Sequence, residues 1–537
     1  MAARILNSPD FKTPNFLTDL NQSVGEYLWK ILQQSKNREC LVHAHTGERR
    51  TLDQIIQQST NLAIQLQNLN CGPDTVIGII SENRHEYLVV VLATFFAGAI
   101  LTCFNPLYTI GELENSLGIS QPSILFCSSV DEKIEKLIKS TSTIQQIISF
   151  DHEEGTPATT LLFENFIKPT QAKLQVVHKD PESIAAILYS SGTTGFPKGV
   201  AITNKNIIYM LKLFRDENIF GIQKKSTIIE FAPMFHAYGL FVLLQSIVLE
   251  IRVVFLQKFE EIVFLQCIER YQVKILFTVP PIVMFLLKDS RVDDFDLSSI
   301  EKIICGAASL KYEIEKAIRK KLKLRTLSQA YGMTECTLAC TLRHKRTGKM
   351  GSSGSALSGV QMKIVDPISN KMLPPNQSGE ICIRGLGVTK GYYRNEKATA
   401  DTFDQEGWLH SGDIGYYDED GDIFIVDRLK ELIKYNAYQI SPAELESILM
   451  KHEKVNDAAV IGVPNDIVGE IPTAFVVKKP GSTISEKELV DYAAALVSPQ
   501  KKLRGGVVFT EQIPKNPSGK ILRRKLKEIY KTLISRY

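Results

Sequence analysis

Short apolar runs alternate with longer segments of helical spacing up to about Gly351, and this alternation limits the fold more than any other feature. The short runs predict buried strands at 75–80, 123–126, 184–188, 274–279 and 302–305. The longer segments predict helices at 52–66, 131–140 and 311–321. Strands that alternate with helices along a chain are typical of an α/β fold with largely parallel sheets.

The texture of the sequence changes at Gly351. Beyond it, Gly, Pro and Asp turns separate short strands, and a final unit of mixed helix and strand pattern follows. In that unit, Ser441-Pro-Ala-Glu444 is a capping box with proline at the first helical position, and a second box opens at Ser485. These signals predict two helices near the end of the chain.

The length of 537 residues exceeds what one hydrophobic core usually organises. We therefore expect an α/β protein with a large N-terminal domain over 1–427, in which helices flank mixed, mostly parallel sheets. Its part at about 351–426 is predicted to be a β-rich subdomain. A small α+β C-terminal domain over 428–537 is predicted to follow, joined by a hinge.

The composition is ordinary for a globular protein, with 44% hydrophobic residues, 23% charged residues and a net charge of +4. Basic runs at 316–323 and 523–527 are interpreted as solvated helix faces, so no nucleic-acid partner is expected. The nine cysteines occur singly without a CxxC pair, which favours buried thiols over a metal site. Because no long apolar run follows the N-terminus and the last three residues are not Ser-Lys-Leu, we expect a cytoplasmic or peroxisomal protein without a signal peptide.

One stretch, 87–104, is uncharged and nearly long enough to span a membrane. Gly98 interrupts it, and the valines at 89–91 followed by Ala-Gly-Ala favour a buried helix that turns into a core strand. We therefore expect no transmembrane span.

Residues 189–199, with the sequence YSSGTTGFPKG, carry the strongest chemical signal. Glycines, hydroxyl side chains and one lysine follow a core strand, and such a loop offers backbone N–H groups, hydroxyl donors and a cation to a polyphosphate. The loop is not a Walker A motif, because Lys198 is followed by Gly199 and the spacing is too short.

The loop resembles the phosphate-loop signature of the adenylate-forming superfamily, which includes acyl-CoA synthetases, 4-coumarate–CoA ligases and beetle luciferases. Four further segments match that superfamily in its order, and together they cover nearly the whole chain. These segments are QAYGMTE at 329–335, SGD at 411–413, DRLKELIK at 427–434 and PKNPSGK at 514–520.

The resemblance implies an ATP- and AMP-binding set in which Tyr331 stacks on adenine, Thr334 contacts the α-phosphate and Asp413 binds the ribose hydroxyls. Glu335 is implied to hold Mg²⁺, which prefers hard oxygen ligands, and Lys430 to lie at the hinge. The nucleotide-binding residues implied in this way are Ser190, Ser191, Gly192, Thr193, Thr194, Gly195, Lys198, Gln329, Tyr331, Gly332, Thr334, Asp413, Arg428 and Gln439.

The resemblance also implies catalytic and substrate residues. Lys520 is expected to bridge the substrate carboxylate and the α-phosphate. The implied catalytic residues are Lys520, Lys434 and His236; the acyl-pocket residues are His236, Tyr238 and Ala307; the CoA-channel residues are Lys258, Asn436 and Ala437. Without the resemblance, a histidine beside aromatic residues is more often a packed core residue.

The expected chemistry accounts for these residue types. A carboxylate must attack the α-phosphorus of ATP while both partners are negative, so cations have to offset the repulsion and hold the approach in line. Lys198, Lys520 and Mg²⁺ supply the positive charge. No protein nucleophile is required, and the sequence offers no convincing Ser-His-Asp or Cys-His set.

Two departures from the family pattern affect the expected reaction. The ligase pattern K-Y-K-G-[FY]-Q reads KYNAYQ at 434–439, so Asn436 removes a charge and Ala437 adds a methyl group in the implied pantetheine channel. Adenylation is expected to be unaffected, whereas the thioester step is put in doubt. The pattern T-H-[RK]-N reads TNKN at 203–206, so a histidine near the site is missing.

The leading hypothesis is an ATP-dependent acid–CoA ligase that activates a fatty or arylpropenoic acid as acyl-AMP and passes the acyl group to CoA, with Mg²⁺ as cofactor. One alternative is a luciferase-like monooxygenase, although Met210 stands where a luciferin-proximal arginine aligns. Another is an adenylation-only paralogue with an impaired CoA step.

Overall fold

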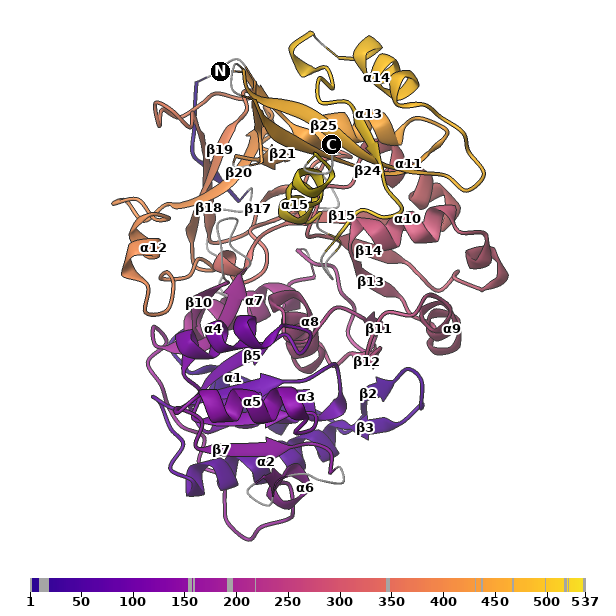
Figure 1. The fold of residues 1–537 in the computed structure, drawn as a ribbon. Coiled ribbons are helices and arrows are strands. Elements are labelled where there is room, and N and C mark those ends of the chain that lie inside the picture. Colours follow the sequence, from indigo (N-terminus) through magenta and orange to yellow (C-terminus); the bar gives the residue numbers. More distant parts are fainter. Residues whose placement is uncertain are drawn as a thin grey trace. The chain divides into compact units, whose positions relative to one another are not determined.

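The computed structural model describes residues 2–8, 19–152, 157, 160–190, 197–217, 219–343, 348–429, 431–435, 438–465, 468–497, 499–515, 519 and 521–534. The chain forms two compact units (Figure 1). The large unit comprises Ile5–Met362 and Ile383–Leu409, and the small unit comprises Met1–Arg4, Lys363–Cys382 and His410–Tyr537. The predicted fold class is confirmed: mixed sheets with flanking helices form a large N-terminal domain, and a smaller α+β domain ends the chain.

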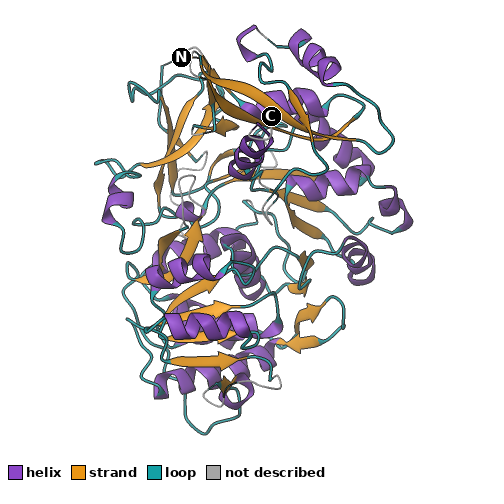
Figure 2. Ribbon diagram, viewed as in Figure 1, coloured by secondary structure: helices purple, strands orange, loops and turns teal. Residues whose placement is uncertain are grey.

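A seven-stranded sheet forms one core of the large unit, and every pairing in it is parallel except that of β10 with β9. Its strands, in spatial order, are β10 (Lys198–Thr203), β9 (Ile184–Ser190), β5 (Ile100–Phe104), β4 (Val76–Ile80), β6 (Ile124–Cys127), β7 (Gln146–Ser149) and β8 (Leu161–Leu162). The accompanying helices are α1 (Val24–Gln34), α2 (Leu52–Asn68), α3 (His85–Phe96), α4 (Ile110–Ser120), α5 (Glu132–Ser140) and α6 (Phe163–Phe166). Apolar residues of α4 and α5 pack with those of β4, β5 and β6 in one buried cluster. Figure 2 shows the helices and strands of the chain in separate colours.

The apolar stretch at 87–104 is a buried helix that turns into a core strand, as predicted. It is almost entirely buried within α3 and β5, and Gly98 makes the turn between them at a φ of +71°. A side chain at this position would also meet Val177, because a Cβ there would lie 2.7 Å from the Val177 Cγ1. Across the described residues, the helices are all too short or too polar to cross a bilayer.

A nine-stranded sheet forms the second core of the large unit, with parallel pairing through its middle and antiparallel pairing at both edges. Its strands, in spatial order, are β17 (Ser355–Ala356), β16 (Thr341–Leu342), β15 (Thr326–Tyr331), β14 (Lys302–Cys305), β13 (Ile275–Thr278), β11 (Thr227–Glu230), β12 (Arg252–Phe255), β2 (Glu39–His43) and β3 (Arg49–Thr51). Helix α7 (Asn204–Arg215) follows β10 and precedes β11, and the helical segments that follow the strands of this sheet are α8 (Ala237–Val248), α9 (Glu261–Tyr271), α10 (Pro280–Lys288), η2 (Ser290–Asp294), α11 (Tyr312–Lys321) and η3 (Thr334–Cys336).

The two faces of the nine-stranded sheet differ in what covers them. Ile229, Leu276 and Ile303, from three neighbouring strands, pack on one face in a large apolar cluster with residues of α9, α10 and α11. Because side chains alternate along a strand, the residues next to them point to the opposite face. That opposite face carries Phe277 and Ile304, which line the cavity described below.

A five-stranded sheet has the order β1 (Leu6–Asn7), β18 (Val360–Val365), β19 (Gly379–Gly385), β20 (Leu409–Tyr417) and β21 (Ile423–Arg428). Strands β18, β19 and β20 each contribute residues to both units. The short helix α12 (Glu396–Ala400) lies in the connection from β19 to β20. These short strands agree with the turn-rich sequence predicted for this part of the chain.

The C-terminal part of the small unit is an α+β structure. A sheet of β23 (Tyr438–Ile440), β22 (Ile433–Tyr435), β25 (Gly469–Lys478) and β24 (Val455–Asn465) is extended by β26 (Val507–Phe509). Helices α13 (Pro442–Met450) and α14 (Glu486–Ala495) pack on one face, and α15 (Arg523–Ile534) packs on the other; the short segment η4 (Pro499–Lys501) follows α14.

The two predicted capping boxes of the small unit form only in part. Both helices begin where predicted, because the hydroxyls of Ser441 and Ser485 accept hydrogen bonds from the backbone N–H groups three residues later. The glutamates do not complete the boxes: Glu444 pairs with Lys501 at 2.7 Å, and Glu488 pairs with a lysine at 3.1 Å. An available lysine thus replaces the cap N–H as the partner of each carboxylate.

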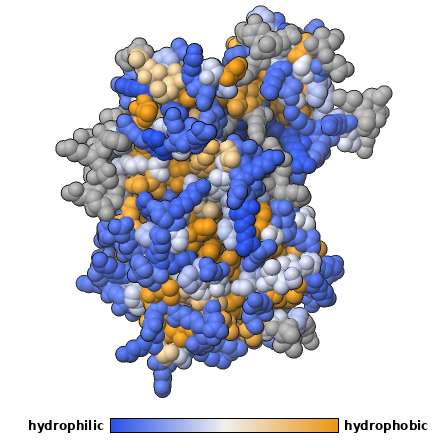
Figure 3. Space-filling view, turned by 90° about the vertical axis from the view of Figure 1, so that its left-hand side faces the viewer, coloured by the Kyte–Doolittle hydropathy of each residue, from blue (hydrophilic) through white to orange (hydrophobic). Residues whose placement is uncertain are grey.

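The surface is ordinary in composition. On the face drawn in Figure 3, hydrophilic residues predominate and hydrophobic residues occur between them. The basic run at 316–323 lies mainly on the outer side of α11, as predicted, while Glu315 and Ile318 of the same helix are buried. All nine cysteines lie in described residues; they are buried and form no disulfide.

Candidate active site

The strand after the predicted phosphate loop is held in close packing. Lys198 begins β10 and is the cross-strand partner of Ser190, the last residue of β9. Gly199 packs so closely that a Cβ there would lie 2.9 Å from Ile119 and 3.0 Å from Ile187. Glycine therefore allows the two strands to approach α4. The predicted loop residues between the strands, Ser191, Gly192, Thr193, Thr194 and Gly195, lie outside the described residues.

Tyr392 connects Lys198 to the predicted metal ligand Glu335. The Lys198 ammonium lies 4.6 Å from the centre of the Tyr392 ring, within the range of a cation–π contact. The Tyr392 hydroxyl donates a hydrogen bond of 2.8 Å to Glu335 Oε1. Burial, and then the neighbouring carboxylate of Glu335, raise the pKa of Tyr392, so this hydroxyl stays a donor. No motif in the sequence indicates the role of Tyr392.

Backbone hydrogen bonds fix this arrangement. The N–H of Tyr393 donates to the carbonyl of Gly199 at 2.7 Å, and the N–H of Thr389 donates to the carbonyl of Glu335 at 2.8 Å. The segment 389–393 therefore joins β10 to the turn that carries Glu335. All of these residues belong to the large unit.

Glu335 is a suitable ligand for Mg²⁺. Its carboxylate is buried, with 5% of the residue exposed, and it accepts one hydrogen bond at Oε1. Among the described residues no donor is bound to its second oxygen, so this hard oxygen can bind a hard cation. When bound, Mg²⁺ would supply positive charge beside the phosphates of ATP.

A cavity of about 110 Å³ lies in the large unit next to this turn. Six residues predicted from the sequence line it: His236, Tyr238, Ala307, Tyr331, Gly332 and Thr334. The remaining wall is mostly apolar: Phe214, Phe220, Ala237, Val242, Phe277, Ile304, Gly306, Ala330, Met333, Leu338 and Ala339. An apolar hollow with a few polar groups is typical of a small-molecule site.

Two residues in the cavity wall adopt demanding conformations. A Cβ at Gly332 would lie 2.0 Å from the carbonyl oxygen of Leu338, so only glycine lets the two backbone segments pass. Ala307 has a φ of +67°, in the left-handed region that alanine rarely adopts. Strained backbone of this kind clusters at functional sites. Both positions were predicted from the sequence, and both belong to the wall that shapes the cavity.

His236 and Tyr238 lie at the beginning of α8. His236 is the residue before the helix, and its side chain makes no capping hydrogen bond. His236 lines the cavity with part of its surface exposed, and desolvation by the surrounding protein lowers the pKa of His236. A neutral imidazole is therefore favoured in the cavity wall. Burial, and then the carboxyl of Glu230, raise the pKa of Tyr238.

Gln329 has a structural role in addition to its predicted one. Its side-chain amide bonds both the N–H and the carbonyl of Leu310 at 2.8 Å, and it also donates to buried Glu315 at 3.2 Å. Glu315 in turn forms an ion pair of 2.6 Å with Arg343. In the strand register Gln329 is the neighbour of Cys305, on the face opposite the cavity. Its contact with the nucleotide stays a prediction.

In the small unit, the predicted ribose ligand Asp413 is held by its neighbours. Asp413 and Arg428 are cross-strand partners on β20 and β21, and Arg428 Nε lies 3.1 Å from Asp413 Oδ1. The N–H of Gly412, directly before Asp413, donates to Glu380 Oε1 at 3.0 Å. The aspartate and arginine predicted to bind one ribose thus lie side by side.

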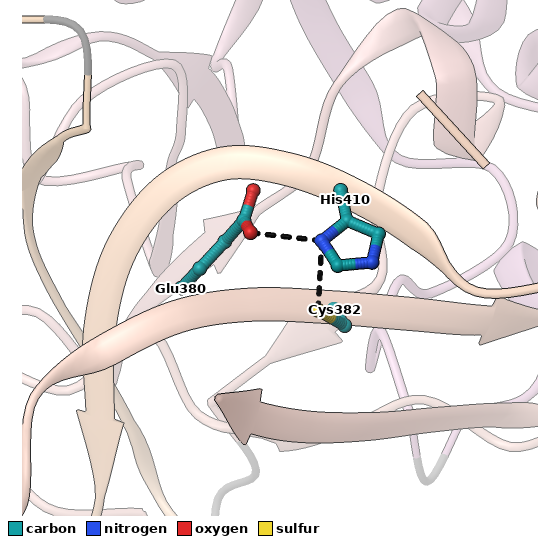
Figure 4. Close-up of side chains that lie close together, drawn as sticks. All are labelled: Glu380, Cys382 and His410. Carbon is teal, nitrogen blue, oxygen red and sulfur yellow. Dashed lines mark hydrogen bonds and ion pairs between the residues drawn. The ribbon is translucent and has the colours of Figure 1, made fainter. Parts of the chain in front are cut away.

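Glu380 belongs to a cluster, with Cys382 and His410, that no sequence motif indicates (Figure 4). His410 Nδ1 lies 2.8 Å from Glu380 Oε2 and 3.6 Å from Cys382 Sγ. The hydrogen bond with Cys382, followed by the one with Glu380, has the largest effect on His410 and raises its pKa to about 10. Their ligand atoms lie within 4.8 Å of one another, but a thiol and an imidazole do not suit Mg²⁺. The cluster instead fixes the carboxylate that holds Gly412.

Two further predicted residues, Lys258 and Lys434, have exposed side chains. Lys258 is exposed and pairs with Glu260 at 3.4 Å. Lys434 is exposed on β22, where it is the cross-strand partner of Gln439. Lys430, Asn436, Ala437 and Lys520 lie outside the described residues. The roles of all these residues stay predictions.

The departure from the family pattern at Asn204 has a structural consequence. The side-chain amide of Asn204 is buried, accepts a hydrogen bond of 2.9 Å from Val24 N–H and donates one of 3.1 Å to the Ser183 carbonyl. Asparagine thus connects α1 to the start of α7. A larger hollow of about 610 Å³ lies between these helices; most of the residues that line it are charged or polar, and none of them is a predicted site residue.

The comparisons with known proteins agree with this geometry. The family model described as AMP-binding enzyme matches residues 28–393, and the model of its C-terminal domain matches residues 444–520. A luciferin 4-monooxygenase of Nipponoluciola cruciata is 38% identical over 526 residues, 96% of each chain. A 4-coumarate–CoA ligase of Nicotiana tabacum is 37% identical over 528 residues, 97% of this chain and 95% of the relative.

Solved structures show the same fold. The crystal structure of ATP-bound MatB from Rhodopseudomonas palustris has a TM-score of 0.85 at 25% identity, covering 95% of this chain and 99% of that one. An o-succinylbenzoate CoA synthetase from Bacillus subtilis, solved with its acyl-adenylate intermediate, has a TM-score of 0.80 at 26% identity and covers 93% of this chain and 97% of that one.

Proposed function

The chain belongs to the AMP-binding enzyme family, within the adenylate-forming superfamily, and on that premise we propose that it is an ATP-dependent acid–CoA ligase. It activates a carboxylic acid, of the fatty or arylpropenoic class, as an acyl-adenylate and then transfers the acyl group to CoA. The names of the ligase relatives and of the acyl-adenylate complex support this reading.

The proposal rests mainly on the surroundings of the segment 331–335. Tyr331, Gly332 and Thr334 line an apolar cavity, and Glu335, the next residue, is linked through Tyr392 to Lys198. An apolar hollow for an acyl group therefore adjoins a cation and a carboxylate suited to a phosphate and its metal ion. Acyl-adenylate formation requires these two environments side by side.

In the first step, a carboxylate oxygen of the acid attacks the α-phosphorus of ATP, and the bond to pyrophosphate breaks. Lys198 and Lys520 offset the negative charge of the two partners, and Glu335 is the residue that would hold Mg²⁺. Asp413 accepts hydrogen bonds from the ribose hydroxyls, and Arg428 reaches the same ribose. In the second step, the CoA thiol attacks the acyl carbon and AMP leaves.

The proposal also assigns a different role to each of the two domains. A large domain over 1–427 carries the cavity, and a small domain over 428–537 pivots at Lys430 to bring first Lys520 and then the 434–439 loop to the site. Lys258, Asn436 and Ala437 belong to the proposed CoA path, in which Asn436 and Ala437 weaken the second step.

A luciferase-like monooxygenase is the second candidate, because a luciferin 4-monooxygenase is as similar to this chain as the ligases are. An adenylation-only enzyme is the third, on account of Asn436 and Ala437. All three share acyl-adenylate formation. Purified protein is to be incubated with ATP, Mg²⁺, CoA and a panel of acids, and the products identified by mass spectrometry. Acyl-CoA supports the ligase, acyl-AMP alone supports the adenylation-only enzyme, and light with luciferin and oxygen supports the monooxygenase.

A further inference from the structure

Glu230, the last residue of β11, is a buried acid beside the acyl cavity. Only 3% of the residue is exposed. Its Oε1 accepts a hydrogen bond of 2.6 Å from the backbone N–H of Ala232. Its Oε2 is also buried, and it has no hydrogen-bond partner among the described residues. Buried polar atoms are rarely left in this state, so a partner for Oε2 is missing.

The strand register puts the Glu230 side chain on the cavity face of the nine-stranded sheet. Ile229, the preceding residue, points to the opposite face, into the cluster with Leu276. Ile229 and Leu276 are neighbours on β11 and β13, so the next residue on each strand, Glu230 and Phe277, points the other way. Phe277 lines the cavity. Glu230 therefore lies next to the cavity wall.

Tyr238, on α8, also indicates that Glu230 lies near the cavity. Its side chain lines the cavity, and the Glu230 carboxyl is near enough to act on the ionisation of its hydroxyl. The Tyr238 hydroxyl donates only a long hydrogen bond, of 3.4 Å, to the Thr278 carbonyl. The Glu230 carboxyl and the Tyr238 hydroxyl thus lie on the same side of a mostly apolar cavity.

The chemical state of Glu230 follows from its surroundings. Burial raises the pKa of Glu230 well above its ordinary value, opposed only by the hydrogen bond from Ala232. Burial therefore favours the protonated, uncharged form of the Glu230 carboxyl. Since Oε1 accepts from the backbone, the proton belongs on Oε2, which becomes an O–H donor in need of an acceptor.

A second buried group without a partner among the described residues lies on α8, the helix that contributes Tyr238 to the cavity. Tyr238, Val242 and Gln245 are spaced i, i+4 and i+7 along α8 and form one stripe of the helix. Tyr238 and Val242 line the cavity. Gln245 continues the stripe by one turn; it is fully buried, and neither amide atom has a partner among the described residues. Two buried polar side chains without partners among the described residues are unusual beside a mostly apolar wall.

We propose that Glu230 is a specificity-determining residue that donates a hydrogen bond to an oxygen substituent on the acyl group, so that the preferred substrate is a hydroxy, oxo or ether acid. This inference rests on the proposed acid-activating function. The substrate oxygen supplies the acceptor that Glu230 Oε2 lacks. An unsubstituted acid leaves the O–H of Glu230 buried without a partner and is activated less well.

The test uses straight-chain acids of one length that carry a hydroxyl at successive carbons, together with the unsubstituted acid, and cinnamic acid paired with 4-hydroxycinnamic acid. Acid-dependent pyrophosphate release gives kcat/KM for each. At least one hydroxylated acid is expected to exceed its unsubstituted partner by about tenfold or more.

Three variants assign that preference to Glu230. Glu230→Leu removes the polar group and is expected to reduce the preference at least about tenfold, mainly by lowering kcat/KM for the hydroxylated acid. Glu230→Gln keeps a hydrogen-bonding group of the same shape and should retain most of the preference. Ser59→Ala is the matched control, because Ser59 is another fully buried side chain without a partner among the described residues, on α2 away from the cavity. It should leave every ratio unchanged.

The possible results separate this inference from the proposed function. Equal activation of hydroxylated and plain acids by the parent protein overturns the inference while acid activation stands, and Oε2 then binds only a buried water. A preference that Glu230→Leu leaves intact overturns it as well. Failure of every acid to release pyrophosphate overturns the proposed function instead. If Glu230→Leu does not fold, the ratio measured in the parent still decides whether an oxygen substituent is preferred, and the same ratio in Glu230→Met, at a melting temperature close to that of the parent, decides whether Glu230 causes the preference.

Discussion

Replacing Tyr392 with phenylalanine removes a single hydroxyl from the link between Lys198 and Glu335. The aromatic ring stays, so the cation–π contact of Lys198 at 4.6 Å is preserved. The hydrogen bond of 2.8 Å to Glu335 is lost. A hydrogen bond to a charged group contributes about 1.5–3 kcal/mol. Since about 1.4 kcal/mol corresponds to a factor of ten, kcat/KM for MgATP should fall about 10- to 100-fold.

The assay is acid-dependent pyrophosphate release at varied MgATP, with the acid saturating. The Mg²⁺ concentration needed for half the maximal rate should rise in parallel, because the Glu335 carboxylate is no longer held in one orientation. Tyr393→Phe is the control, because it removes a hydroxyl from the adjacent residue without touching the link to Glu335. If Tyr392→Phe has the same kcat/KM for MgATP as Tyr393→Phe and the same unfolding midpoint as the parent, the role given to Tyr392 is refuted.

Three further predictions follow from the site. Lys520→Ala should slow acyl-AMP formation by about 100- to 1,000-fold, the effect of losing one transition-state contact; a near-normal rate of pyrophosphate release at an unchanged melting temperature contradicts its role. The folded pKa of His410, about 10 against an ordinary 6.5, gives stability that is complete below about pH 6.5 and lost as pH rises to about 10. The free energy of unfolding, measured with denaturant, should therefore fall more steeply over that pH range in the parent than in His410→Gln. If it falls equally in both proteins, the cluster does not raise the pKa of His410. Asn436→Lys combined with Ala437→Gly should raise acyl-CoA yield and leave adenylation unchanged, with the lysine effect weaker at high salt; no gain at any salt concentration shows that these residues do not limit the CoA step.

The fold was predictable where short apolar runs are buried on both faces. The predicted strand at 302–305 is β14 without a shift of either end, and the prediction for 184–188 is correct but two residues short of β9. A strand that is buried on both faces needs a continuous run of apolar residues, and such a run can be recognised in the sequence. The helix starts at Ser441 and Ser485 were predictable for a similar reason, because capping is a local interaction.

Long-range contacts were not predictable in this way. The lysine partners of the two capping glutamates are distant in sequence, and so are Cys382 and His410, which strand pairing brings together from 28 residues apart. Neither Tyr392 nor Glu230 belongs to a sequence motif. Tyr392 is distinguished by its hydrogen bond to Glu335, and Glu230 by an Oε2 atom without a hydrogen-bond partner among the described residues. Such properties depend on the assembled sheet rather than on the local sequence.

Direct detection of the acyl-adenylate tests the central claim. The protein is incubated with ATP, Mg²⁺ and the acid panel without CoA, quenched within a single turnover, and analysed for acyl-AMP and pyrophosphate by mass spectrometry. We predict that both appear in equal amounts, only when an acid is present. ATP consumption that yields ADP and phosphate, or pyrophosphate that forms without any acid, would contradict the assignment of this site to acid activation.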